Sequence, residues 1–293
     1  MNDIRFDDRV VIVTGASSGI GRAHALYLAR RGAKVLVNSR TKPAAQAVTA
    51  EIETSGGEAL AYAGDVGLRE DAEAMAAAAL TRWGRIDVLI NNAGFVRDRS
   101  FMKMTAEDFD AVVQAHLGGS IHCTRAVLPA MKQQGYGRIV FTTSGAGFYG
   151  NFGQSNYSSA KLGMIGFMRT LRLEIAQYGI HVNALAPIAL TPMNAALMPP
   201  ELRERLDTQS TAAAATFLAS EQCRLNGETL VAGGGQFACM QFTESRGVQA
   251  AEHEISPEFI ASRWDAIADS HDAYQFADGS AAFAARFGHS WGK

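Results

Sequence analysis

A tyrosine and a lysine four residues apart are the residues of this chain best suited to acid–base chemistry. Tyr157 and Lys161 would lie on one face of a helix, because residues four apart are neighbours there. A free tyrosine titrates at about pH 10, but a nearby ammonium group favours its phenolate form. Ser144 stands thirteen residues earlier, just past another strand-like run at residues 139–141. Tyr157 could therefore exchange a proton near neutral pH, although a tyrosine and a lysine at this spacing more often form a plain surface pair.

Three glycines between an apolar run and a helical stretch form a second candidate site. Residues 10–13 read as a strand, residues 14–21 as a turn, and a helix begins near Arg22. Such a turn lets the backbone approach a pyrophosphate, and the N-terminal amides of the helix face the anion. A purely structural turn is the alternative. We expect a dinucleotide to bind this turn through Gly15, Ser17, Ser18, Gly19, Ile20 and Gly21.

Strand-like and helix-like stretches alternate along most of the chain. Short β-branched runs recur at intervals long enough to hold a helix, which predicts βαβ units and a parallel sheet covered on both faces. We expect an α/β protein with a doubly wound (Rossmann) sheet of about seven strands in residues 1–235. Residues 236–293 carry 4 Lys+Arg against 8 Asp+Glu and break this rhythm. They predict a helical C-terminal extension, packed on the domain or on a partner subunit, with a helix beginning at Ser256 and Pro257.

The composition excludes several classes of protein. The chain has 293 residues, of which 47% are hydrophobic and 19% charged, so neither disorder nor a collagen-like fold is expected. A formal net charge of -2 gives no positive field for nucleic acid. No apolar run approaches the roughly 18 residues of a membrane helix. Three cysteines outside any CxxC spacing, and no signal-peptide pattern, predict a cytoplasmic protein, and no metal site is expected.

The order of four motifs resembles the short-chain dehydrogenase/reductase family over about residues 7–235. The motifs are the glycine turn, the Asn-Asn-Ala-Gly run at 91–94, Ser144, and the pair Tyr157 and Lys161. The resemblance implies an oxidoreductase that acts on CH–OH groups, with Tyr157 as the acid and base. It implies that Lys161 lowers the pKa of Tyr157 and binds the nicotinamide ribose, that Tyr157 also contacts the cofactor, and that Ser144 binds the substrate oxygen.

The resemblance also implies further site residues. Asp65 and Val66 would contact the adenine, and other residues would lie along the rest of the cofactor: Asn91, Ala93, Gly94, Pro187, Ile188 and Thr191. The family commonly has an asparagine in its fourth helix that supports a water beside the lysine, and His116 stands there in this chain. His116 could hydrogen-bond that water, or it could be a polar helix residue with a satisfied neighbour.

The end of the second strand predicts the choice of cofactor. Ser39 and Arg40 stand where NAD-binding proteins place a carboxylate, and an arginine can pair with the 2′-phosphate of NADP. We therefore expect NADP(H), with NAD(H) as the alternative. Arg40 could also be an ordinary solvated loop residue.

A narrower resemblance concerns the substrate. His116, Leu117 and residues 149–157 resemble the dehydrogenase domains of type 2 peroxisomal multifunctional enzymes, which oxidise (3R)-hydroxyacyl-CoA thioesters. Some members act on steroids, and the group typically has an Asp at the position of Ser39 and favours NAD. We expect a 3-hydroxyacyl thioester or a bulky alcohol such as a hydroxysteroid to bind Ser144, Phe148, Tyr149, Met193 and Leu197. A homodimer or homotetramer is expected, and a non-catalytic dinucleotide-binding regulator is the alternative function.

Overall fold

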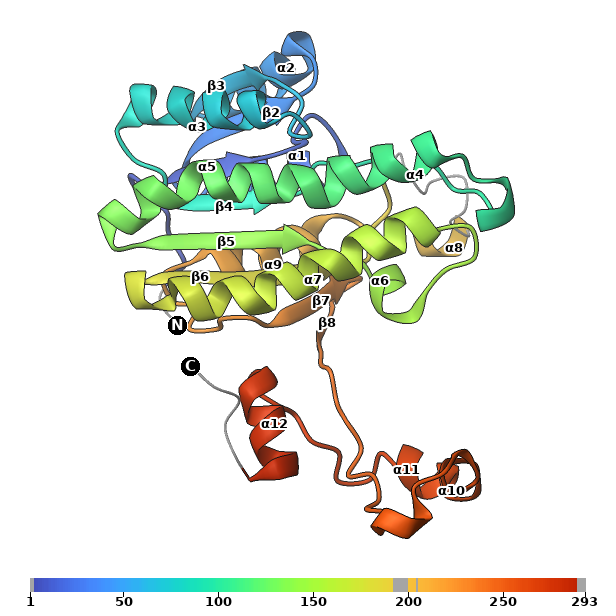
Figure 1. Cartoon of the computed structure of the whole chain (residues 1–293). Helices are drawn as coiled ribbons and strands as arrows, with labels where there is room; N and C mark the ends of the chain where they lie inside the picture. The colour runs from blue at the N-terminus through green and yellow to red at the C-terminus, as the bar shows by residue number, and fades with distance from the viewer. Residues whose placement is uncertain (1–2, 192–199, 204, 289–293) are drawn as a thin grey trace. The chain divides into compact units, whose positions relative to one another are not determined.

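The computed structural model of the chain describes residues 3–191, 200–203 and 205–288. The chain divides into two compact units, Met1–Cys239 and Met240–Lys293. The division falls a few residues after the boundary at 235 that the sequence suggested. Figure 1 shows the sheet and its helices in the first unit and three short helices in the second.

The first unit is built on one eight-stranded sheet of order β3-β2-β1-β4-β5-β6-β7-β8, in which the first seven strands pair in parallel (Figure 1). The strands are β1 (Val10–Val13), β2 (Lys34–Ser39), β3 (Glu58–Ala63), β4 (Val88–Asn91), β5 (Gly137–Thr142), β6 (Ile180–Pro187), β7 (Thr229–Gly233) and β8 (Gln236–Met240). The doubly wound sheet is therefore confirmed. It has one strand more than expected, because a turn at Gly234 and Gly235, with φ of +57° and +77°, places β8 beside β7.

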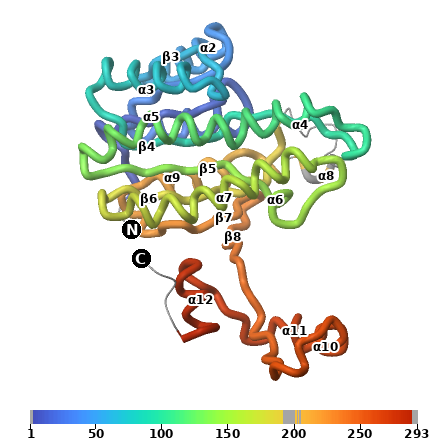
Figure 2. Tube along the Cα trace, in the orientation of Figure 1, coloured from blue at the N-terminus to red at the C-terminus, as the bar shows by residue number. Residues whose placement is uncertain are grey.

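Helices cover both faces of this sheet, and the view of Figure 2 shows α3, α5 and α7 on one of them. The helices are α1 (Gly19–Ala29), α2 (Lys42–Thr54), α3 (Arg69–Trp83), α4 (Ala106–Val113), α5 (Gly119–Gln134), α6 (Gly145–Tyr149), α7 (Ser155–Ile175), α8 (Pro200–Arg203) and α9 (Gln209–Ala219). A π-helical turn, Gln114–Gly118, joins α4 to α5. Within the described ranges, no helix is both long and apolar enough to cross a membrane.

Alternate residues of β1 enter two separate cores. Val11 and Val13 pack with residues of α1, α2 and α9, whereas Val10 and Ile12 pack with residues of α3, α5 and α7. Successive side chains of a strand point to opposite faces, so a strand covered on both sides is apolar throughout. This explains the uninterrupted apolar run at residues 10–13, all of which are fully buried.

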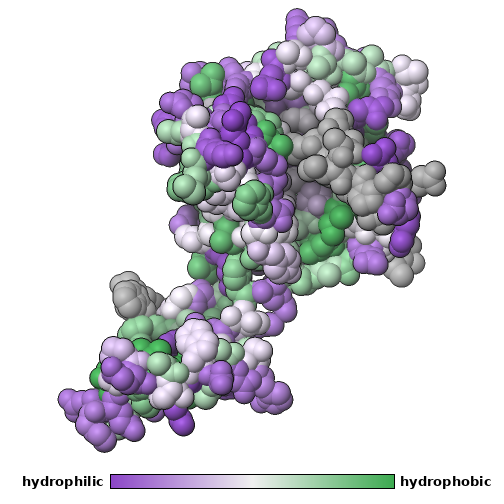
Figure 3. All heavy atoms as spheres, turned by 90° about the vertical axis from the view of Figure 1, so that its right-hand side faces the viewer, coloured by the Kyte–Doolittle hydropathy of each residue, from purple (hydrophilic) through white to green (hydrophobic). Residues whose placement is uncertain are grey.

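The second unit contains α10 (Pro257–Ser262), α11 (Trp264–Ala268) and α12 (Gly279–Phe287). Ser256 caps α10 by accepting a hydrogen bond from the amide of Phe259 at 3.1 Å, at the helix start that the sequence predicted. None of the described residues of this unit is buried. Apolar side chains such as Ile260 and Trp264 stay 54% and 59% exposed, and Figure 3 shows apolar groups on the surface of this unit.

Candidate active site

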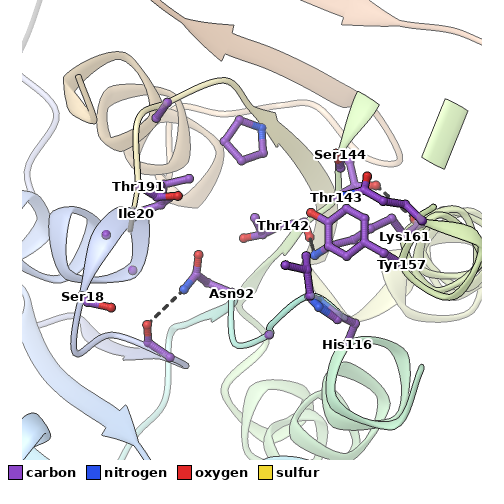
Figure 4. Close-up of a pocket in the computed structure, with 18 of the residues that line it drawn as sticks. Ser18, Ile20, Asn92, His116, Thr142, Thr143, Ser144, Tyr157, Lys161 and Thr191 are labelled. Atoms are coloured by element: carbon purple, nitrogen blue, oxygen red, sulfur yellow. Dashed lines mark hydrogen bonds between the residues drawn. The ribbon is translucent and has the colours of Figure 1, made fainter. Parts of the chain in front are cut away.

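The carboxyl ends of β1, β4, β5 and β6 surround a cavity of about 330 Å³ (Figure 4). The strand order reverses between β1 and β4, and ligands of doubly wound sheets bind at this switch point. Many of the predicted site residues line the cavity: Gly15, Ser18, Gly19, Ile20, Gly21, Gly94, His116, Ser144, Tyr157, Lys161, Pro187 and Thr191. The structure therefore brings the glycine turn and the Ser144, Tyr157 and Lys161 set into one site.

The glycine turn is fixed by hydrogen bonds to the chain after β4. The Thr14 hydroxyl accepts from the amides of Asn92 and Ala93 at 2.9 and 3.0 Å. The side-chain amide of Asn92 donates to the carbonyls of Thr14 and Gly15 at 3.0 and 3.2 Å. A Cβ on Gly15 would lie 2.7 Å from the Cα of Ala93, so only glycine fits there. Asn92 was not among the predicted residues, whereas the predicted Asn91 turns inward to Thr124.

The N-terminus of α1 fits an anionic group. The side chain of Ser18 precedes the helix but makes no capping hydrogen bond. Among the described residues, the amides of Gly19 and Ile20 have no acceptor, although both residues line the cavity. Unpaired amides at a helix N-terminus bind phosphate groups. This cradle therefore fits the pyrophosphate of a dinucleotide.

The side chains of Ser144, Tyr157 and Lys161 meet at the other end of the cavity (Figure 4). Ser144 is the N-cap residue directly before α6 and hydrogen-bonds the Tyr157 side chain, which α7 carries. Lys161 lies one turn further along α7, is only 2% exposed and donates to the carbonyl of Thr142. Its Nζ lies 5.4 Å from the centre of the Tyr157 ring. The ordinary helical spacing of Tyr157 and Lys161 thus produces a buried pair here.

Burial controls the ionisation of this pair. Burial lowers the pKa of Lys161 to about 7. Burial also raises the pKa of Tyr157, while the hydrogen bond from Ser144 lowers it and the charge of Asp98 raises it. The net direction for Tyr157 is upward, opposite to the effect that we expected from Lys161, because burial disfavours the phenolate. A protonated phenol is suited to give a proton to a substrate oxygen.

His116 lies in the π-helical turn and contacts both the chain after β4 and Tyr157. Its Nε2 is 2.8 Å from the carbonyl oxygen and 3.1 Å from the amide nitrogen of Phe95. Its ring meets the Tyr157 ring edge-on, with 5.1 Å between centres. Burial, with a smaller effect of the Lys161 charge, lowers the pKa of His116 to about 3, so the ring is neutral. Nε2 is thus hydrogen-bonded to the backbone of Phe95, whereas the buried Nδ1 has no hydrogen-bond partner in the described structure.

Other predicted cofactor residues lie outside the cavity lining: Ser17, Ser39, Arg40, Asp65, Val66, Asn91, Ala93 and Ile188. Ser39 is buried at the end of β2, and the exposed Arg40 follows it. The guanidinium of Arg40 is 6.0 Å from the centre of the Phe95 ring. One carboxylate oxygen of Asp65 accepts from the amide of Gly67 at 2.8 Å. These residues are near the sheet edge that bears the site, and their contacts with a cofactor stay predictions.

The predicted substrate residues are only partly brought together. Ser144 lines the cavity, but Phe148 and Tyr149 do not. Phe148 packs against the core, and Tyr149 is 83% exposed. Met193 and Leu197 lie outside the described residues.

Several lining residues were not predicted: Asn92, Val96, Asp98, Thr142, Thr143, Asn151, Gln154 and Ala189. A signal existed for Thr142 and Thr143, because they end or follow a strand and strand ends meet at this edge. Asn151 and Gln154 stand just before Tyr157 in the sequence. For Asp98 the sequence held no comparable signal, because the path of a long loop is not encoded in local patterns.

A doubly wound sheet with this glycine turn and a Ser–Tyr–Lys set defines a short-chain dehydrogenase. The family model described as short chain dehydrogenase matches residues 9–201, and the chain belongs to that family. It is therefore an oxidoreductase that acts on hydroxyl groups and uses a nicotinamide dinucleotide.

Three similar proteins narrow this class. Peroxisomal multifunctional enzyme type 2 of Mus musculus is 41% identical over 281 residues, which are 92% of this chain and 38% of the relative. The full-length structure of that enzyme from Drosophila melanogaster matches with a TM-score of 0.81 and 34% identity, over 97% of this chain and 49% of that chain. A 7α-hydroxysteroid dehydrogenase complexed with NADH and 7-oxo glycochenodeoxycholic acid matches with a TM-score of 0.75 and 30% identity. The match covers 80% of this chain and 98% of the dehydrogenase chain. The resemblance to the type 2 group is confirmed, and the chain spans less than half the length of those two multifunctional proteins.

Proposed function

We propose that this enzyme interconverts a 3-hydroxyacyl thioester and its 3-oxo form with NADP(H). The observation that carries the proposal is the single cavity that contains the glycine turn together with Ser144 and Tyr157. A nicotinamide dinucleotide held at the glycine turn would supply or accept the hydride. Ser144 and Tyr157 would hold the substrate oxygen, and Tyr157 would give its proton in reduction and take it back in oxidation.

Lys161 and His116 support Tyr157 in this proposal. The ammonium of Lys161 is anchored on the Thr142 carbonyl and would contact the nicotinamide ribose. His116 holds the Tyr157 ring from the side, and its Nδ1, which has no partner among the described residues, would accept a hydrogen bond from or donate one to a water beside Lys161. Cofactor contacts by the predicted residues outside the cavity, Ser39 and Arg40 among them, belong to the same proposal.

The thioester is favoured by the likeness to the type 2 multifunctional enzymes. A bulky alcohol such as a hydroxysteroid is the second candidate, and the neighbour whose title names a 7-oxo bile acid supports it. A non-catalytic regulator would need the glycine turn but no proton donor, and the juxtaposed Ser144 and Tyr157 side chains speak against it. No disulfide joins Cys123, Cys223 and Cys239 in the described part of the chain, which fits a reducing compartment such as the cytoplasm. The mouse relative is named as peroxisomal.

One set of assays, with two ketone substrates and both reduced cofactors, tests the reaction and the choice of cofactor. We expect purified enzyme to reduce a 3-oxoacyl-CoA faster than a ketosteroid, and to prefer NADPH to NADH. The guanidinium of Arg40 would pair with the 2′-phosphate, so Arg40→Ala should lower kcat/KM for NADPH by about tenfold or more and leave NADH unchanged. The measurement is the loss of absorbance of the reduced cofactor in steady state.

The matched control is Arg224→Ala, which changes another exposed arginine, located before β7 rather than after β2. An unchanged cofactor ratio in Arg40→Ala would reject NADP(H) selection by this residue. Turnover of the ketosteroid alone would favour the second candidate. Cofactor binding without turnover of any ketone would favour the regulator.

We further propose a homo-oligomer in which the C-terminal unit contacts a partner subunit. The unit has apolar helices but no buried residue among those described, and so small a segment lacks a core of its own. We expect Ile260→Glu with Trp264→Glu in the full chain to lower the mass measured by light scattering. Asp265→Lys, on the same helices, is the control and should not change the mass. An oligomer that survives the double substitution would remove these helices from the interface.

A further inference from the structure

Three polar side chains of the cavity have no part in the proton transfer described above. Asp98, Asn151 and Gln154 all line the cavity that contains Tyr157. The side-chain amide of Gln154 donates to Oδ2 of Asp98 at 2.8 Å. The side-chain amide of Asn151 donates to Oε1 of Gln154 at 3.1 Å. We call these three residues the Asp98 network.

The hydrogen bonds of this network have a fixed direction. An ionised carboxylate can only accept, so Gln154 must present its NH₂ group to Asp98 and its oxygen to Asn151. The chain of bonds therefore runs from Asn151 through Gln154 and ends on an acceptor. The second carboxylate oxygen of Asp98 has no hydrogen-bond partner within the described ranges. Asp98 is solvent-exposed and lines the cavity, so that oxygen can accept from water or from a donor that enters the cavity.

No cation neutralises Asp98 within the described part of the chain. Its sequence neighbours Arg97 and Arg99 both turn to Asp108, at 2.9 and 3.6 Å. The negative charge of Asp98 is close enough to Tyr157 to raise its pKa. An uncompensated carboxylate at this position disfavours anionic parts of a substrate and favours N–H or O–H groups.

Hydrogen bonds to backbone carbonyls hold the loop that carries Asp98 at a defined place relative to Tyr157. The amide of Arg99 donates to the carbonyl of Gly153 at 2.9 Å. The side chain of Asn156, next to Tyr157, donates to the carbonyls of Arg97 and Asp108, each at 3.2 Å. Gly153 has φ of +81°, a conformation that favours glycine. The loop that carries Asp98 is thus tied to the start of α7, and the acceptor is preorganised.

We propose that Asp98 accepts a hydrogen bond from an amide N–H in the arm that carries the thioester of the substrate. The inference rests on the proposed function and adds the part of the substrate that is recognised. The amide nitrogen of a cysteamine-type arm lies only two carbons from the sulfur, so it is close to the reacting carbon. A steroid nucleus or a simple alcohol offers no N–H at this point. The Asp98 network therefore selects amide-bearing thioesters over other ketones.

A pair of substrates that differ in one group tests this inference. One is a 3-oxoacyl N-acetylcysteamine thioester, and the other is the same thioester with its amide nitrogen methylated, which removes the N–H donor. Because hydrogen bonds to charged groups are the strong ones, the wild type should favour the first by about tenfold in kcat/KM. Asp98→Leu should bring this ratio to about one, whereas Asp98→Asn should give an intermediate ratio.

A second readout separates this role from a structural one. Because the Asp98 charge raises the pKa of Tyr157, Asp98→Asn should move the pH profile of alcohol oxidation to lower pH. The matched control is Asp110→Leu, an exposed acid on α4, which should keep both the wild-type ratio and the wild-type profile. Circular dichroism of each variant checks its fold. If Asp98→Leu does not fold, the ratio measured with Asp98→Asn tests the inference in its place.

The outcomes separate the inference from the function on which it rests. A wild-type ratio near one, or equal losses on both thioesters in the Asp98 variants, would overturn the role of Asp98 while thioester reduction stands. Reduction of neither thioester, with turnover of another ketone, would overturn the proposed substrate and this inference with it.

Discussion

Replacing Tyr157 with Phe is expected to lower kcat for thioester reduction by about 10²–10⁴-fold, the range for loss of a positioned proton donor. Only the hydroxyl that Ser144 contacts is lost. The ring should keep its edge-on contact with His116, at 5.1 Å between centres. Because the glycine turn lies at the other end of the cavity, NADPH binding should stay within about twofold of wild type. Steady-state kinetics and fluorescence titration with NADPH measure the two effects.

The control for this variant is Tyr178→Phe. Tyr178 follows α7 and packs against the core away from the cavity lining, so loss of its hydroxyl should leave kcat unchanged. If Tyr157→Phe kept more than about a tenth of the wild-type kcat, another group would have to supply the proton. The catalytic role of Tyr157 would then be wrong, although the fold and the family would stand.

The second large effect is expected from Gly94→Ala. A methyl group there would overlap the ring of His116, which its bond to Phe95 and its burial hold in place. Overpacking of this kind should lower the free energy of unfolding by about 1–3 kcal/mol and, through displacement of the ring against Tyr157, reduce kcat by at least about tenfold. Urea unfolding and steady-state kinetics measure these changes.

A suppressor variant makes this prediction specific. Gly94→Ala combined with His116→Ala removes the overlap, so the double variant should be more stable than the sum of the single effects predicts. Its kcat should stay low, because His116 no longer holds the Tyr157 ring. Gly166→Ala on α7 is the control, since a Cβ at that position would have no described atom within 4 Å beyond its chain neighbours and the nearby backbone of its own helix. Strictly additive effects of the two substitutions would show that the ring does not cause the loss.

The sequence predicts those parts of the site whose positions follow from local rules. Gly15 and Gly19 lie between a strand and a helix, and Tyr157 and Lys161 lie one turn apart on α7. Each motif is contiguous, and parallel strands bring their carboxyl ends to one edge. The elements that position these motifs could be predicted for the same reason, since burial on both faces produces apolar strands.

The rest depends on contacts between residues distant in sequence. The sequence favoured Asn91 over Asn92, but only the register of β4 beside β1 makes Asn92 the partner of Thr14. The pKa of Tyr157 follows from its burial, which motif spacing does not report. Asp98 reaches the cavity through a loop whose path is fixed by its bond to Gly153. Long-range pairing of this kind leaves no periodic signal.

The two cores on opposite faces of the sheet have a consequence for how this enzyme can change. Neither core includes Asp98, Asn151 or Gln154, which lie beyond the strand ends. Substitutions at these three positions need not open a void or leave a buried polar group without a hydrogen-bond partner. They therefore avoid the main causes of destabilisation by mutation. Selection can therefore adjust which molecules are admitted while folding remains untouched, and one scaffold can acquire new substrates in single steps.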